Sequence, residues 1–237
     1  PLRRLAHHLR NQIHRKRGQM EGRVEIERYP LNLAPTDAHG PSVILNAFRY
    51  WAAQVEQTQV DAAGLLTGAP WLSLRAFGLE HGFTPVMLDL GRIGGTVPGP
   101  VDPRMLIHAK IPVITAWDPP LRGDHGFAAI VGYDDRQRII LVQAAGSVEP
   151  LELDYHTFNR LHGDQGWPAM VALPPREMPR WDDAGVKPVS SAVAEGWLAI
   201  DEKISAGDFT AARTASDRLR ANGADSINPV VEQQALR

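Results

Sequence analysis

The sequence predicts an α+β protein in which helices come first and a meander of strands follows. Apolar residues recur at helical spacing after Gly40-Pro41, and Pro41 suits a first helical turn, where a missing N–H leaves nothing unpaired. Further along, the apolar run 125–133 is separated from the run 138–143 by Asp134-Asp135, which is typical of an antiparallel hairpin. A helical half ahead of antiparallel strands indicates an α+β arrangement.

Composition bounds the class of protein before any motif is considered. The 237 residues are 43% hydrophobic and 22% charged, which is enough to bury a substantial core. The formal net charge of −2 argues against whole-molecule electrostatic attraction to nucleic acid, which we do not expect as a partner. The count of zero cysteines excludes disulfides, thiolate metal sites and a cysteine nucleophile.

Location follows from the termini and from hydropathy. No apolar run reaches the roughly 18–20 residues of a membrane span, and the N-terminus has no continuous apolar signal region. A chain that starts at Pro1 fits removal of an initiator methionine, although an excised segment would look the same. We therefore expect a cytoplasmic protein, with membrane association as the alternative.

Residues 1–22 are predicted to hold a basic amphipathic helix. Leucine and isoleucine recur at positions 2, 5, 9 and 13, and arginine or lysine residues fill the other faces. One interpretation is contact of residues 2–17 with an anionic membrane surface or an acidic partner. The favoured one is a helix packed on the domain, because the apolar stripe is narrow and lacks Trp or Phe.

Residues 23–175 are predicted to form the main domain. Its expected elements are a strand at 23–33 interrupted by Pro30, helices at 41–54, 57–67 and 70–82, an extended piece at 83–90, a short helix at 103–109, strands at 112–117, 125–133, 138–143 and 148–153, a helix at 155–161 and a strand at 169–173.

The C-terminal part is predicted to be a proline-rich linker at 176–189 and a helical hairpin with a frayed tail at 190–237. The two helices are expected at about 190–205 and 209–221. Their connection, Ala206-Gly207-Asp208, followed by Phe209, resembles one tetratricopeptide-type hairpin. A single repeat cannot bury its face alone, so a hairpin docked on the main domain is an equal alternative.

Three residues stand where a catalytic group would be useful. His39 precedes the helix that starts at Pro41, near its free N–H groups. His125 starts a buried strand, and Gln143 ends the neighbouring strand of the same hairpin, so these strand ends are expected to be close. A histidine at a strand end, an amide behind it and a helix N-terminus in front match the layout of base, orienting group and nucleophile.

The same stretches carry a resemblance to a known family. His39-Gly40-Pro41-Ser42 and its apolar helix are similar to the Cys-Gly-Pro-Ala opening of the papain-like double-glycine leader peptidases. The run 123–134, Gly-Asp-His-Gly-Phe-Ala-Ala-Ile-Val-Gly-Tyr-Asp, resembles the stretch that holds the family's general base, and 110–114 resembles the strand before it. The similarity spans about residues 30–175 and implies a papain-like fold, with N-terminal helices packed on an antiparallel sheet.

The departures from that family bear on function. His39 occupies the position of the nucleophilic cysteine, and Gln143 the position of the aspartate. Asn32 is the only amide near the position of the oxyanion-hole glutamine, while His125 keeps the general-base position. Glutamine can fix a histidine tautomer but cannot stabilise an imidazolium as a carboxylate does.

The resemblance therefore implies a catalytically inactive domain that binds an extended, Gly-Gly leader-like peptide or a protein partner in the former substrate groove. Gly40, Asp124 and Trp117 are the candidate peptide-binding residues, and no cofactor is expected.

Two alternatives stay open. The first is acyl or aminoacyl transfer, or hydrolysis, with His125 as general base and His39 as a polarising group; Ser42 is a weaker candidate nucleophile, since it lies inside the helix. The second is a metal site formed by His39 and His125, with Asp124 or Asp37 adding an oxygen, a set that zinc would accept.

Overall fold

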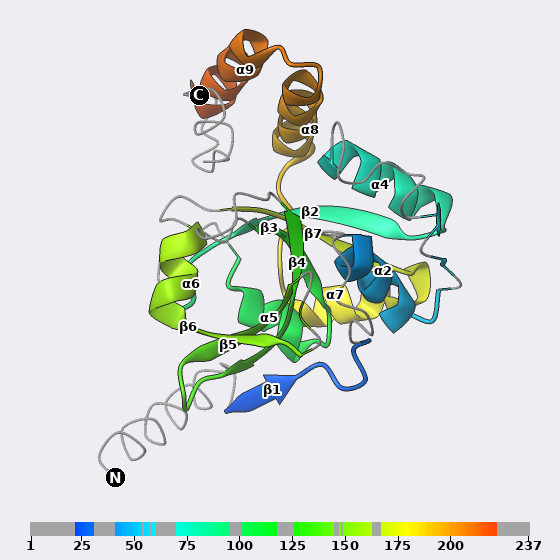
Figure 1. The fold of residues 1–237 in the computed structure, drawn as a ribbon, viewed down its shortest axis with the longest axis vertical. Coiled ribbons are helices and arrows are strands. Elements are labelled where there is room, and N and C mark those ends of the chain that lie inside the picture. The colour runs from blue at the N-terminus through cyan, green and yellow to red at the C-terminus, as the bar shows by residue number, and fades with distance from the viewer. Residues whose placement is uncertain are drawn as a thin grey trace.

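The computed structural model places seven strands in one sheet and helices around it (Figure 1). It describes residues 22–30, 41–53, 55–56, 58–59, 70–94, 101–117, 126–144, 147, 149–162 and 167–221. The strands are β1 (Arg23–Glu25), β2 (Thr84–Leu90), β3 (Val113–Trp117), β4 (Gly126–Asp134), β5 (Ile139–Ala144), β6 (Leu151–Asp154) and β7 (Trp167–Leu173). The helices are α2 (Pro41–Tyr50), α4 (Pro70–Glu80), α5 (Pro103–His108), α6 (Tyr155–His162), α7 (Met178–Ala184), α8 (Ser191–Ser205) and α9 (Phe209–Ala221), with a 3₁₀ turn, η1, at Pro175–Glu177.

The strand order is β2-β7-β3-β4-β5-β6, and every pairing between these strands is antiparallel. The predicted α+β class with an antiparallel sheet is thereby confirmed, as is the hairpin formed by β4 and β5. Asp134 closes that hairpin, since its Oδ1 accepts hydrogen bonds from the backbone N–H groups of Arg136 and Gln137 at 2.8 and 3.0 Å.

β4 pairs with two strands along one edge. Its first half pairs with β3 and its second half with β1, through Tyr133 opposite Val24. Between Ile130 and Gly132 the pairing with β5 slips by one residue, which is a β-bulge. β4 is therefore the central strand of the sheet, as Figure 1 shows.

Helices α2 and α4 lie on one side of β4, and α6 lies on the other (Figure 1). α2 packs against β4 and β3, and α4 packs against β2 and α8. Phe48 of α2 makes edge-to-face contacts with Phe77 and Phe83, at ring-centroid distances of 5.2 and 4.6 Å. Burial of such a ring contributes about 2–3 kcal/mol, so these contacts fix α2 against α4.

The outer edge of β2 is covered by segments distant in sequence. The backbone N–H of Val101 donates to Asp89 O at 2.6 Å, and that of Val189 donates to Met87 O at 3.2 Å. Pro85 has no N–H to offer at this edge. An edge occupied in this way does not present a free ladder to another chain.

Several boundaries differ from the sequence-based expectation. The helix predicted at 41–54 ends at Tyr50, where Ala52 takes a left-handed φ of 61°. The strand predicted at 23–33 ends at Glu25, and the one predicted at 148–153 is β6, Leu151–Asp154. Of the helix predicted at 57–67 the structure describes only residues 58–59, which are helical, and the basic helix of residues 2–18 and the tail after 221 lie outside the described residues.

The segment 176–189 is not the irregular linker that its prolines suggested. It contains the end of η1 and all of α7, whose Trp181 is buried. Proline occupies the first turn of each of these elements, where it favours helix formation, and Gly185 ends α7 with a left-handed φ of 63°. None of the described helices is long and apolar enough to cross a membrane.

Candidate functional site

The helix of the candidate site begins as predicted, directly after His39-Gly40. α2 starts at Pro41 and buries Val43, Ile44 and Phe48 completely. This apolar face explains why the helix packs on β4 and β3. His39, Gly40 and Asn32 themselves lie outside the described residues, so their predicted roles stay predictions.

The strand of the candidate site begins directly after His125. Gly126 is the first residue of β4 and pairs with Trp117, the last residue of β3. His125 and Asp124 lie outside the described residues, and so does the side chain of Trp117. The structure thus fixes the elements that carry the candidate residues and brings those elements, α2 and β4, into contact.

Gln143 is the one candidate side chain that the structure describes. It lies one residue before the end of β5, opposite Ala129, which is four positions after His125. Its side chain is fully buried, and Nε2 donates a hydrogen bond to Ser147 O at 2.6 Å. Oε1 is also buried and accepts no hydrogen bond from the part of the chain that the structure describes.

The environment of Gln143 decides what it can do chemically. One N–H of the amide is used by Ser147 O, and the buried Oε1 remains an acceptor, which can hold one neutral tautomer of an imidazole. It adds no negative charge beside a developing imidazolium, which the aspartate of a triad does. Gln143 can therefore orient a histidine without making it a stronger base.

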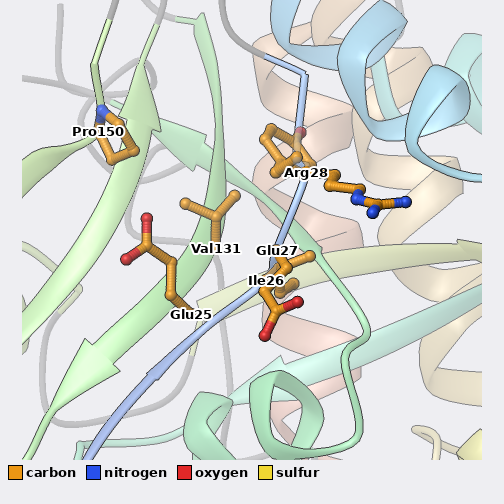
Figure 2. Close-up of a pocket in the computed structure, with 7 residues that line it drawn as sticks. Glu25, Ile26, Glu27, Arg28, Val131 and Pro150 are labelled. Carbon is orange, nitrogen blue, oxygen red and sulfur yellow. The ribbon is translucent and has the colours of Figure 1, made fainter.

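A cleft that the sequence did not indicate lies beside β1 (Figure 2). Its volume is about 450 Å³, and its lining residues are Glu25, Ile26, Glu27, Arg28, Tyr29, Val131 and Pro150. Figure 2 shows Glu25 and Pro150 on one side of Val131 and Arg28 on the other, with the guanidinium directed away. The Glu25 carboxylate is paired with Arg23 at 3.3 Å, and the Glu27 carboxylate beside apolar side chains suits a group that is part apolar and part cationic.

Two further features distinguish the wall of this cleft. Arg28 has a left-handed φ of 60°, a conformation that a long side chain seldom adopts. The hydroxyl of Tyr29 is buried without a hydrogen-bond partner among the described residues, and this burial raises its pKa. The alternation of residues 23–29 predicted a strand here, but nothing in it signalled a cleft.

A buried ionic network at the far end of β4 was also missed from the sequence. Arg104 on α5 bonds both carboxylate oxygens of Asp102, and its Nη1 lies 2.6 Å from Oδ1 of Asp135. The hydroxyl of Tyr155 donates to the same oxygen at 2.8 Å. Burial works against the charge on Arg104, but hydrogen bonds and both carboxylates raise its pKa overall.

This network is structural in character. Asp102 also accepts from the backbone N–H of Arg104 at 3.0 Å and so caps α5. Burial and the neighbouring Asp135 raise the pKa of Tyr155, which keeps that hydroxyl a donor. The network ties α5, the turn between β4 and β5, and α6 together.

No group of three or more histidine, aspartate or glutamate side chains is placed to hold a metal among the described residues. The proposed metal pair, His39 and His125, falls outside them. Of the other histidines, His81 lies against Phe77, with Nδ1 2.9 Å from Phe77 O, and His108 and His156 are exposed.

Comparison with known proteins returned few similarities. No family model matches the chain, and no curated protein matches it either. Among solved structures it is similar to a double glycine motif protease from an AMS/PCAT transporter, determined in complex with the leader peptide. The TM-score is 0.42 and the sequence identity 11%, over 65% of this chain and 99% of that one.

Proposed function

We propose that this protein is a peptidase-like domain without peptidase chemistry, which binds an extended peptide or an extended segment of a partner protein. The observation that carries the proposal is the combination of site elements with a chain that has no cysteine. A buried helix starts two residues after His39, and it packs on the strand that starts one residue after His125. The arrangement of α2 packed on β4 is suited to holding a peptide, but the thiol nucleophile that would cleave it is missing.

Gln143 supports binding over catalysis. A base that abstracts a proton must become an imidazolium, and a neutral amide gives that cation little stabilisation. Because Gln143 is fully buried and bonded to Ser147 O, its side chain is held in place by the fold. We infer that this amide maintains the shape of the groove and does not activate a base.

The peptide chemistry that we propose combines a small, extended end with a basic residue. The Gly-Gly preference comes from the sequence resemblance, which covers the region of His39 and His125. The basic residue is inferred from the cleft at β1, where Glu27 stands beside Ile26 and Val131. A lysine or arginine side chain has the apolar stem and charged head that this surface would accept.

Replacement of His125 separates binding from catalysis. His125→Ala should change the Kd for such a peptide by less than about threefold, because the backbone of β4 and the cleft at β1 are unaltered. His156→Ala is the matched control, since His156 is exposed on α6. If the wild type turns over a substrate, and His125→Ala binds the peptide normally but shows no turnover, His125 would be assigned to catalysis.

A second candidate function, acyl transfer with His125 as the base, is favoured by one observation. Oε1 of Gln143 is an acceptor that no described residue uses, and an imidazole N–H is a suitable donor for it. For this function Gln143→Leu should abolish turnover of an activated acyl ester, while Gln143→Glu should raise it. If the protein only binds peptides, the wild type, Gln143→Leu and Gln143→Glu should all fail to turn over the acyl ester.

A further inference from the structure

The contact of the C-terminal helical pair, α8 and α9, with the rest of the molecule includes one buried carboxylate. Asp201 of α8 is 9% exposed, and its Oδ2 accepts hydrogen bonds from the backbone N–H groups of Trp71 at 2.8 Å and Leu72 at 3.2 Å. Both N–H groups lie in the first turn of α4, where no carbonyl of the helix itself can accept from them. Asp201 thus caps α4 from a helix some 130 residues away.

Apolar contacts accompany this cap. Trp197, Leu198 and Ile200 of α8 are buried, as is Trp71 of α4. Figure 1 shows α8 above the end of α4 and joined to the sheet by the segment that carries Val189. The helical pair is therefore held by apolar contacts, with the hydrogen bonds to Asp201 as a buried polar contact beside them.

Asp201 has no cationic partner among the described residues. Arg75 on α4 pairs with Glu195 on α8, at 3.3 Å. The remaining charged groups of the packed helices whose side chains the structure describes are Glu80 on α4, Glu202 and Lys203 on α8, Asp208 just before α9, and Arg213, Asp217 and Arg218 on α9. None of these forms a described ion pair with Asp201, so its charge is balanced only by two N–H dipoles and by the positive end of α4.

We propose that Asp201 makes this contact a pH-dependent latch, through which the C-terminal helical pair binds α4 more tightly in mild acid than at neutral pH. Docking buries the carboxyl group, and burial favours the neutral form. Docking then takes up a proton at Asp201 from solvent in the range where the free carboxyl is ionised and the buried one is not. A protonated carboxyl still accepts from Trp71 and Leu72 through its carbonyl oxygen, so the cap survives protonation.

The direction of the effect follows from the pKa of the docked state. Burial raises the pKa of Asp201 to about 6, and the hydrogen bonds from Leu72 and Trp71 oppose this rise. Because the pKa is raised in the docked state, proton uptake by Asp201 stabilises docking. This stabilisation is complete below the pKa of the free carboxyl, near 3.9, and is lost as pH rises through about 6. Between pH 5 and pH 7.5 the docking equilibrium should weaken by about 10-fold.

Amide hydrogen exchange at Trp71 and Leu72 tests this inference directly, because Asp201 is their only described acceptor. Their protection factors in the full chain, corrected for the intrinsic pH dependence of exchange, should be about 10-fold higher at pH 5 than at pH 7.5. In Asp201→Asn, whose amide oxygen can still accept, the dependence should vanish. Asp208→Asn is the matched control, since exposed Asp208 caps α9 through the N–H of Ala211. This variant should leave the pH dependence of protection at Trp71 and Leu72 unchanged.

A carboxyl titration of the wild-type protein by NMR guards against a variant that fails to fold. A pKa of Asp201 near 6 supports the latch, and a pKa below 5 overturns it. Protection at Trp71 and Leu72 that is equal at the two pH values in the wild type, or equally pH-dependent in Asp201→Asn, also overturns it.

Discussion

Gly132 of β4 lies between β1 and β5, where it pairs with Glu25 and Leu141. A Cβ built there would lie 2.6 Å from Cδ1 of Leu141 and 3.0 Å from the backbone oxygen of Val24. Gly132→Ala should therefore lower the free energy of unfolding by about 1–3 kcal/mol, because the Leu141 side chain would have to move and the backbone of β1 would have to shift slightly. Urea denaturation followed by circular dichroism measures this change.

Gly78 is the matched control within α4. Its added Cβ would meet its nearest neighbour, Pro85, at 3.5 Å, which is ordinary contact. Gly78→Ala should raise the free energy of unfolding by about 0.5–1 kcal/mol, because alanine loses less backbone freedom in a helix. Equal stabilities for the two alanine variants would contradict this account of Gly132.

Residue-level roles were only partly readable from the sequence. Asp134 was expected in the hairpin turn and accepts two turn hydrogen bonds there. Gln143 was expected near the strand end that carries His125, but the register places it opposite Ala129. The position of a side chain along a sheet depends on bulges and register, and these depend on contacts distant in sequence.

At the scale of elements, the network around Arg104 joins α5, the β4–β5 turn and α6. Arg104→Ala would leave the carboxylates of Asp102 and Asp135 without a cation, and Asp135 is buried. The free energy of unfolding should fall by about 3–5 kcal/mol, in the range for one broken partner of a buried ion pair.

Thermal or urea unfolding of Arg104→Ala tests this expectation, with Arg160→Ala as control. Arg160 is an exposed arginine on α6, and its replacement should change stability by less than about 0.5 kcal/mol. Arg104→Lys should recover only part of the loss, because lysine cannot make the two-point contact with Asp102. Similar unfolding curves for both alanine variants would mean that the network contributes no net stability.

The sequence predicted the elements whose signals are local. β4, β5, α4, α8 and α9 appear where apolar periodicity and turn residues placed them. The sequence did not predict α7, because prolines in the segment 174–188 indicate a linker, whereas Pro179 stands in the first turn of α7, where proline is tolerated. Its place in the fold depends on Trp51, whose ring lies under Arg180 at 5.5 Å and whose carbonyl accepts from Arg176.

At the scale of the whole molecule, Asp201 makes global stability depend on pH. The pKa of Asp201 in the folded protein is about 6, above the ordinary value for aspartate. Its contribution to the free energy of unfolding is therefore present in acid and is lost as pH rises through about 6. The unfolding free energy of Asp201→Asn, relative to the wild type, should increase by about 2 kcal/mol from pH 4 to pH 7.5. A difference between the two proteins that stays constant over this range would contradict the assignment.

The docked position of the C-terminal helical pair also shows what the sequence left open. A tetratricopeptide-type hairpin and a hairpin docked on the main domain were equal alternatives, because helical periodicity does not say what a helix packs against. The structure shows α8 packed on α4, with Gly196 so close to Leu219 of α9 that an added Cβ would lie 2.7 Å from Cδ1. The acceptor for Trp71 and Leu72 could not be inferred, since it lies about 130 residues away.

The central claim is that the molecule binds an extended peptide and leaves it unchanged. The most direct measurement is calorimetric titration of the full chain with a peptide that carries a basic residue and ends in Gly-Gly, followed by mass spectrometry of the mixture. A peptide of the same composition that ends in Val-Val is the control. The account predicts saturable binding of the Gly-Gly peptide, weaker binding of the control and an unaltered peptide mass, whereas cleavage, acylation or the absence of binding would contradict it.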